Sequence, residues 1–107
     1  MRKPVSLALA ILAGLSAGAF AATSATITQK GRVFSSESVS IKKGDAVTFV
    51  NDDTVPHNIV STSKGNEFNL GSQAPGASTD VTFKDVGEAL VICAIHPGMK
   101  MTVKITD

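Results

Sequence analysis

The chain contains one cysteine and two histidines, and all three lie in two short segments. The first segment is Val55-Pro56-His57-Asn58, and the second is Cys93-Ala94-Ile95-His96-Pro97-Gly98-Met99. A thiolate, two imidazoles and a thioether are ligands that together can hold a transition metal ion. If all of them bind one ion, the fold must bring position 57 next to position 93. That requirement constrains the fold more than any other feature of the sequence.

The spacing within the second segment makes a single metal site feasible. Cys93 is predicted to end a strand, and His96 and Met99 follow at intervals of three residues in a tight loop. His57 must then come from a neighbouring strand or its edge. Two imidazole nitrogens and one thiolate in a trigonal arrangement, with a weak axial thioether, are the ligand set of a blue copper site. An ion held by both segments would also stabilise a small domain by closing a long loop.

The first 21 residues have the pattern of a secretory leader. Arg2 and Lys3 precede an almost purely apolar run from Val5 to Leu15, and Ala19-Phe20-Ala21 has small residues at the positions that a signal peptidase requires. We predict cleavage after residue 21. A transmembrane anchor is disfavoured because the apolar run to Ala22 is short and lacks a basic flank on its far side.

The predicted mature chain, residues 22–107, is long enough for one small domain. Two of the ten basic residues leave with the leader, so eight remain against nine acidic residues and the formal charge becomes −1. This charge gives no electrostatic basis for binding nucleic acid. Export leads to an oxidising compartment, where Cys93 has no partner within the chain. Intermolecular pairing, a buried inert thiol and metal ligation each explain this residue.

Short runs of β-branched and apolar residues, separated by turn residues, predict strands along the whole mature chain. Residues 51–54 and 63–78 read as loops, and no segment outside the leader has the pattern of an amphipathic helix. Many short strands indicate a β-sandwich or barrel. The predicted strands are Ala25–Thr28, Ser38–Lys42, Ala46–Val50, His57–Thr62, Thr79–Phe83, Ala89–Cys93 and Met101–Ile105.

Over nearly the whole mature chain, these residues resemble the cupredoxins, the type 1 blue copper proteins. The segments Val39–Asn51 and Pro56–Val60 are similar to the part of that family around its first histidine. The segment Cys93–Met99 resembles the ligand loop of amicyanin, with plastocyanin and pseudoazurin as relatives. The resemblance implies an all-β, cupredoxin-like Greek-key sandwich or barrel that forms a single domain and holds one copper ion.

By this resemblance, His57, Cys93 and His96 would be the equatorial copper ligands, and Met99 would be the axial ligand. Plastocyanin and pseudoazurin have their methionine five residues after the histidine, and Met101 lies at that spacing. We favour Met99, because Met101 fits the apolar phase of the last predicted strand and the shorter loop matches amicyanin.

Asn58 would, by the same resemblance, pin the two ligand segments together. Amicyanin-like loops usually have a hydroxyl residue and a proline between the cysteine and the histidine, whereas this chain has Ala94 and Ile95. We therefore expect backbone groups to do the pinning. Unlike proline, Ile95 has a backbone N–H, and we expect it to donate to the Cys93 sulfur and raise the reduction potential.

The resemblance implies a periplasmic electron carrier that works between redox proteins such as a dehydrogenase and a c-type cytochrome. Electrons would leave through the exposed edge of His96, surrounded by an apolar docking rim of Val55, Pro56, Pro97 and Gly98. We expect a monomer that is not anchored to a membrane after cleavage of the leader.

Two other functions fit part of the same residues. A protein that binds, delivers or stores copper or zinc would use the same nitrogen and sulfur ligands. A thiol enzyme would use Cys93 with a histidine as its base. We do not expect an enzyme, because no oxyanion-hole motif accompanies the cysteine and a small sandwich leaves little room for a substrate.

Overall fold

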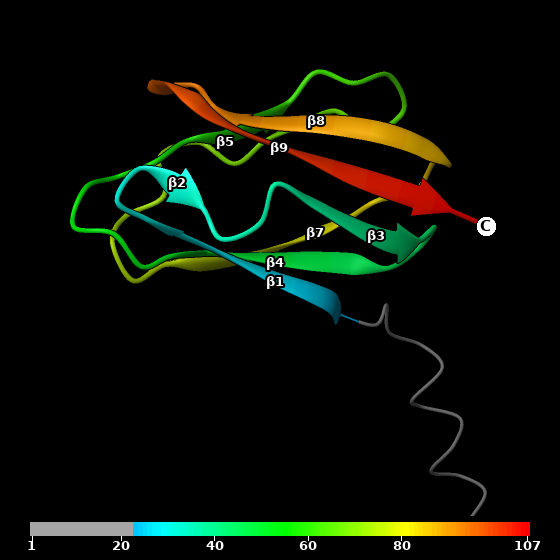
Figure 1. Ribbon diagram of the computed structural model, residues 1–107, viewed down its shortest axis with the longest axis horizontal. Helices are drawn as coiled ribbons and strands as arrows, with labels where there is room; N and C mark the ends of the chain where they lie inside the picture. The colour runs from blue at the N-terminus through cyan, green and yellow to red at the C-terminus, as the bar shows by residue number, and fades with distance from the viewer. Residues whose placement is uncertain (1–22) are drawn as a thin grey trace, which may run out of the picture.

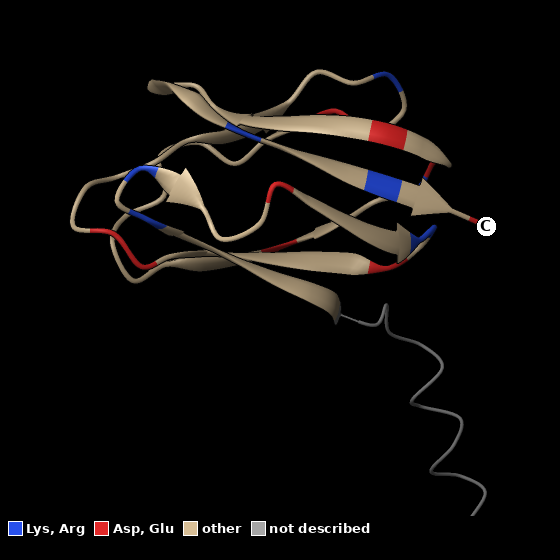
Figure 2. Cartoon of the chain, in the orientation of Figure 1, with Lys and Arg blue, Asp and Glu red and all other residues tan. Residues whose placement is uncertain are grey.

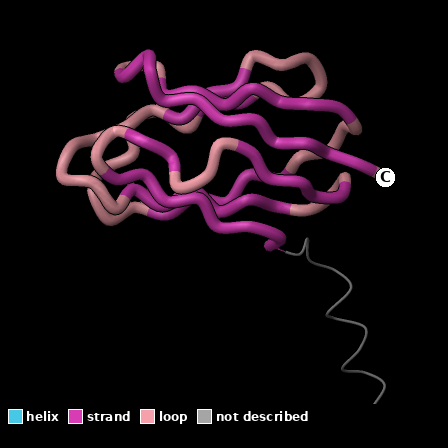
Figure 3. The backbone as a smooth tube through the Cα atoms, in the orientation of Figure 1, coloured by secondary structure: helices cyan, strands magenta, loops and turns pink. Residues whose placement is uncertain are grey.

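The computed structural model describes residues 23–107, which form strands and loops (Figures 1 and 3). The predicted leader and its cleavage point lie outside the described residues. Within residues 23–107, nine strands form two sheets, which confirms the predicted all-β sandwich. Among the described residues there is no helix long and apolar enough to cross a membrane.

The first sheet has four strands in the order β2-β1-β4-β7. Its strands β1 and β4 run parallel, and the other pairs are antiparallel. The strands of this sheet are β1 (Thr23–Lys30), β2 (Val33–Phe34), β4 (Ala46–Asn51) and β7 (Ser78–Thr82).

The second sheet has five strands in the order β3-β9-β8-β5-β6. Here β3 runs parallel to β9, and the remaining pairs are antiparallel. The strands of this sheet are β3 (Ser38–Lys42), β5 (Ile59–Ser61), β6 (Phe68–Asn69), β8 (Gly87–Cys93) and β9 (His96–Thr106).

The core lies between the two sheets, because successive residues of a strand point to opposite faces. In β9, Met101, Val103 and Ile105 are buried while Lys104 is exposed, as the alternation in the sequence predicted. Phe49 packs edge-on against the ring of Phe34, and the full core cluster joins apolar side chains of both sheets. The fully enclosed members of the cluster include Ile27, Val47, Phe49, Ile59, Phe83, Val91 and Val103.

The segment after Cys93 is more regular than the loop that we predicted. Cys93 pairs directly with His96 across a tight hairpin, so β9 begins at that histidine. The next pair joins Ile92 to Lys100, which leaves residues 97–99 as an irregularity in the ladder. The apparent loop in the sequence is therefore a bulged hairpin, because two turn residues are enough to connect antiparallel strands.

Two other segments differ from the predicted strand pattern. The strand predicted from His57 to Thr62 is shorter, and His57 itself makes an isolated bridge with Gln73. The region predicted as a loop between residues 63 and 78 contains β6, which pairs with β5. Strands β5 and β6 are both short, and pairing with other strands determines where they begin and end more than the local sequence does.

Three connections gather at one end of the sandwich, opposite the C-terminus (Figure 1). They are the β1–β2 turn, the β4–β5 loop and the β8–β9 hairpin. Figure 2 shows acidic residues in the β4–β5 loop and a basic residue in the β1–β2 turn at this end. Both ligand segments therefore lie at the same end of the molecule.

Candidate metal centre

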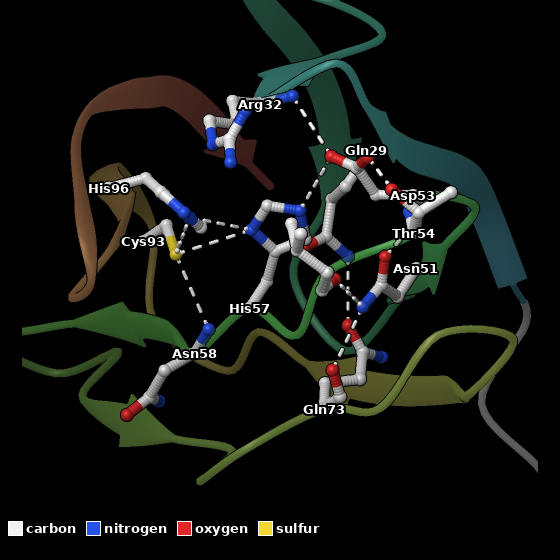
Figure 4. Close-up of polar contacts among 11 residues, drawn as sticks. Gln29, Arg32, Asn51, Asp53, Thr54, His57, Asn58, Gln73, Cys93 and His96 are labelled. Atoms are coloured by element: carbon white, nitrogen blue, oxygen red, sulfur yellow. Dashed lines mark hydrogen bonds and ion pairs between the residues drawn. The ribbon is translucent and has the colours of Figure 1, made fainter.

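Three ligand atoms converge at this end and form a nearly equilateral triangle (Figure 4). Sγ of Cys93 lies 3.6 Å from Nδ1 of His57 and 3.6 Å from Nδ1 of His96. The two Nδ1 atoms are 3.1 Å apart. A point equidistant from the three atoms would lie about 2 Å from each, close to the metal–nitrogen and metal–sulfur distances of protein sites. The donor set and its geometry therefore fit one transition metal ion.

Sheet pairing brings the two ligand segments together. Cys93 ends β8 opposite Ile59 of the neighbouring strand β5, and His57 lies two residues before that position. The backbone of His57 exchanges two hydrogen bonds with Gln73, with N···O distances of 3.1 and 2.7 Å. Both His57 and Cys93 are fully buried, whereas His96 is partly exposed. The site is thus closed toward the core and open at a single histidine.

Backbone groups join the two ligand segments at Asn58. Its N–H donates to Sγ of Cys93 at 3.3 Å, and its carbonyl accepts the N–H of Ala94 at 2.8 Å. The Asn58 side chain instead donates to Oδ1 of Asn69 at 2.8 Å. Among the described residues, the donation expected from Ile95 N to the sulfur is not seen. The sulfur therefore receives its backbone hydrogen bond from the other ligand segment.

The two candidate axial methionines differ in what surrounds them. Met99 and Met101 are each only 2% exposed and lie on the same face of β9. Met101 belongs to the hydrophobic core cluster, whereas Met99 is buried outside it, next to the bulge that follows His96. Core packing therefore accounts for Met101 and does not account for Met99.

A carboxylate supports His57 from the side opposite the triangle. Oδ2 of Asp53 lies 3.0 Å from Nε2 of His57 and also accepts the backbone N–H of Arg32 at 3.0 Å. Its other oxygen, Oδ1, accepts the N–H of Thr54 at 2.9 Å. The hydrogen bonds from Arg32, from His57 and from Thr54 hold the pKa of Asp53 well below its ordinary value. Sequence reasoning missed this residue because it saw positions 51–54 only as a loop.

A buried polar network fastens the β4–β5 loop below the site. Asn51 donates from Nδ2 to the carbonyls of Val55 and Gln73, at 3.0 and 2.8 Å, and accepts the N–H of Asp53 at 2.9 Å. The Gln73 side chain accepts from Gln29 at 2.8 Å and donates to a β4 carbonyl at 3.0 Å. Buried polar groups that are hydrogen-bonded in this way hold a loop in one conformation.

Both ligand segments contain apolar residues that are not buried. Pro56, Pro97 and Gly98 are exposed, and Val55 is half-buried. The Ile95 side chain, in the second segment, is 53% exposed. Burial lowers the pKa of His96, and electrostatic interactions with His57 and Arg32 lower it further.

The two-sheet fold, together with a buried sulfur and two histidine nitrogens at one end, defines a copper protein of the cupredoxin class. Residues 21–106 match the family described as copper binding proteins, plastocyanin/azurin family, and the chain belongs to that family. Membership in this family confirms copper as the cofactor predicted from the sequence.

The known proteins most similar to the chain include a curated relative and two solved structures. Methylamine utilization protein MauL of Methylorubrum extorquens is 36% identical over 61 residues, which are 56% of this chain and 54% of that protein. The chain thus matches about half the length of this relative. The copper-containing nitrite reductase NirK of Thermus scotoductus SA-01 superposes with a TM-score of 0.71 at 26% identity, over 78% of this chain and 22% of that one.

A reduced mutant of amicyanin superposes with a TM-score of 0.67 at 23% identity, over 75% of this chain and 79% of that one. At this identity the superposition shows the fold alone. The family match shows that the chain is a cupredoxin, and this superposition shows that its fold is like that of amicyanin, as the sequence predicted.

Proposed function

We propose that this protein is a periplasmic blue copper electron carrier that binds one copper ion through His57, Cys93, His96 and Met99. The observation that carries the proposal is the triangle of one sulfur and two Nδ1 atoms, with sides of 3.6, 3.6 and 3.1 Å. Copper bound there would supply a one-electron couple, because trigonal nitrogen and sulfur ligation is compatible with both oxidation states.

The protein contributes rigidity around the ligands. Asp53 and the Gln73 backbone hold His57, and Asn58 N holds the Cys93 sulfur. A ligand set that is held by hydrogen bonds moves little between two charge states, which favours fast electron transfer. Water is excluded on the core side because His57 and Cys93 are fully buried.

Met99 is the axial ligand that we propose. It is buried beside the β9 bulge and outside the core cluster, whereas Met101 packs within that cluster. A thioether that core packing does not explain, three residues after His96, is suited to a weak axial position.

Electrons would enter and leave at the exposed edge of His96. The docking rim around it would consist of Val55, Pro56, Pro97 and Gly98, none of which is buried. A small apolar rim suits brief encounters between redox proteins. We propose a dehydrogenase as the donor and a c-type cytochrome as the acceptor. Support for a dehydrogenase comes from the relative MauL, which is named for methylamine utilization.

The proposed location rests on the predicted leader, residues 1–21. The basic pair Arg2-Lys3, the apolar run and the small residues before position 22 are a secretory pattern. Cleavage would release residues 22–107 as a monomeric domain without a membrane anchor. Detection of a mature N-terminus at Ala22 in a periplasmic extract would support this location, and recovery of the intact chain in the membrane fraction would contradict it.

A visible absorption titration of residues 22–107 with Cu(II) tests the proposed function. An intense thiolate-to-copper band should reach its maximum at one equivalent and bleach reversibly with ascorbate. The variant Cys93→Ser should lack the band, and Met101→Leu should retain it. A colourless product, or a band that ascorbate does not bleach, would contradict an electron carrier and favour the alternative, a copper or zinc storage protein.

A further inference from the structure

Asp53 links the buried ligand His57 to the turn between β1 and β2. One carboxylate oxygen, Oδ2, accepts both from Nε2 of His57 and from the backbone N–H of Arg32, each at 3.0 Å. Neither Asp53 nor Arg32 belongs to the predicted ligand set. Figure 4 shows the backbone nitrogen of Arg32 and the His57 ring both in contact with the Asp53 carboxylate.

We propose that Asp53 is a positioning residue of the metal site, held by the Gly31–Arg32 turn, that keeps the His57 proton on Nε2 and its Nδ1 lone pair directed at the ion. This inference rests on the proposed function, because it takes His57 as a ligand.

The hydrogen-bond chemistry of the pair determines the tautomer. A carboxylate is only an acceptor, so the contact between Oδ2 and Nε2 requires the proton to lie on Nε2. In neutral imidazole the other nitrogen, Nδ1, then has a free lone pair. Nδ1 is the atom that lies 3.6 Å from the Cys93 sulfur, within the triangle. The carboxylate thus prepares His57 to bind through Nδ1.

The turn that holds Asp53 has an unusual backbone. Gly31 and Arg32 both have positive φ angles, of 64° and 59°, and Arg32 is the only non-glycine residue with positive φ among the described residues. Two successive positive φ angles are typical of the tight hairpin turn that joins twisted strands. This conformation directs the Arg32 N–H at Oδ2 of Asp53. Arginine has no intrinsic preference for this region, so the contact is consistent with strain kept at a functional site.

Asp53 also places a negative charge against a fully buried ligand. Its side chain is only 10% exposed, and that of His57 is fully buried, so water screens their interaction weakly. A carboxylate hydrogen-bonded to a ligating imidazole makes the imidazole a stronger electron-pair donor to the metal. A stronger electron-pair donor stabilises Cu(II) more than Cu(I), because the ion of higher charge is stabilised more by the donated electrons.

Asp53→Ala tests the inference, and the neighbouring Asp52→Asn is the matched control. Asp52 is exposed, and in the part of the chain that the structure describes its side chain makes no hydrogen bond to His57, Cys93 or His96. In the metal-free protein, the ¹⁵N shifts of the His57 ring should show a single Nε2–H tautomer in the wild type and in the control. Asp53→Ala should show a mixture, and its Zn(II) affinity, measured by competition with a chelator, should fall about 10–100-fold.

The variant Asp53→Asn provides a second test if Asp53→Ala does not fold. Its amide oxygen still accepts from Nε2, so the tautomer should persist while the charge is lost. Its reduction potential should therefore rise, by about 59 mV for each tenfold loss of Cu(II) affinity relative to Cu(I). An unchanged tautomer or an unchanged Zn(II) affinity in Asp53→Ala, relative to Asp52→Asn, would overturn the inference.

His57→Ala separates failure of this inference from failure of the proposed function. If Zn(II) affinity is unchanged in His57→Ala, His57 is not a ligand and the proposed site is wrong. If the affinity falls in His57→Ala but is unchanged in Asp53→Ala, the site stands and only the role of Asp53 is lost.

Discussion

Asn58 donates its backbone N–H to Sγ of Cys93, with 3.3 Å between nitrogen and sulfur. Ala94 donates a hydrogen bond to the Asn58 carbonyl at 2.8 Å, so the main chain of Asn58 contacts both the cysteine sulfur and the residue after the cysteine. A hydrogen bond donated by the backbone depends on the fold, and does not depend on the identity of the side chain at position 58, after His57. The Asn58 side chain is consequently free to serve another contact.

Asn58→Ala should leave the copper site nearly unchanged. The side chain bonds Asn69 and not a ligand, so the substitution keeps both main-chain contacts. We expect the absorption maximum and the reduction potential to stay at their wild-type values. The free energy of unfolding should fall by about 0.5–1.5 kcal/mol, the net contribution of one hydrogen bond. A shift of the thiolate-to-copper band would show instead that the side chain pins the site, contrary to the backbone pinning that we expect from the sequence.

Met99 and Met101 should respond to substitution in opposite ways. Met101→Ala removes core packing and should lower the free energy of unfolding by about 2–5 kcal/mol, with the blue band retained. Met99→Leu preserves volume and should change stability by less than about 1.5 kcal/mol. Its reduction potential should rise, because loss of an axial donor destabilises Cu(II) more than Cu(I).

Chemical denaturation and voltammetry of the two variants measure these effects. The proposed assignment predicts a large stability loss in one variant and a large potential shift in the other. If Met101→Ala shifts the potential while Met99→Leu does not, the axial ligand is Met101.

The sequence predicted the strands of the sandwich and the closeness of Cys93 to His96 because both depend on local patterns. Alternation in β9 marked Met101, Val103 and Ile105 as core, and the spacing of Cys93 and His96 is fixed within one hairpin. Such features need no knowledge of distant contacts.

Features that depend on tertiary contacts could not be predicted in this way. Asp52 and Asp53 are adjacent and have the same side chain, yet only Asp53 contacts His57. Its carboxylate is held there because it accepts the backbone N–H of Arg32 in the β1–β2 turn. The Gln29–Gln73 hydrogen bond joins residues 44 positions apart, and neither glutamine lies in a recognisable motif. Loop conformation and sheet register decide both contacts.

Arg32→Gly should stabilise the metal-free protein. Arg32 has φ of 59°, a region that costs an L-residue about 1–2 kcal/mol and costs glycine little. The substitution keeps the backbone N–H that Asp53 accepts. We expect the free energy of unfolding to rise by about 1 kcal/mol after the greater entropy of unfolded glycine is subtracted. Thermal unfolding of Arg32→Gly beside Arg32→Ala measures the effect, and equal stability of the two variants would contradict it.

Ile95 and Val86 offer a matched test of where electrons are exchanged. Both are exposed aliphatic residues, at 53% and 56%, and they lie at opposite ends of the sandwich. Ile95 is in the hairpin turn next to His96, whereas Val86 precedes β8 at the far end. If electrons leave through His96, as we propose, self-exchange between reduced and oxidised copies requires two His96 edges to approach each other.

Ile95→Asp places a carboxylate on both partners at that contact. Two like charges repel each other as the proteins approach, which slows the encounter. Burying them in a small apolar interface also requires the free energy of removing water from both carboxylates. We expect the self-exchange rate, measured by NMR line broadening in a partly oxidised sample, to fall at least about tenfold at low salt, with partial recovery at high salt. Val86→Asp adds the same charge far from His96 and should stay within about twofold of wild type at high salt, because long-range repulsion is then screened. Equal slowing of the two variants at high salt would mean that electrons do not leave through the His96 end.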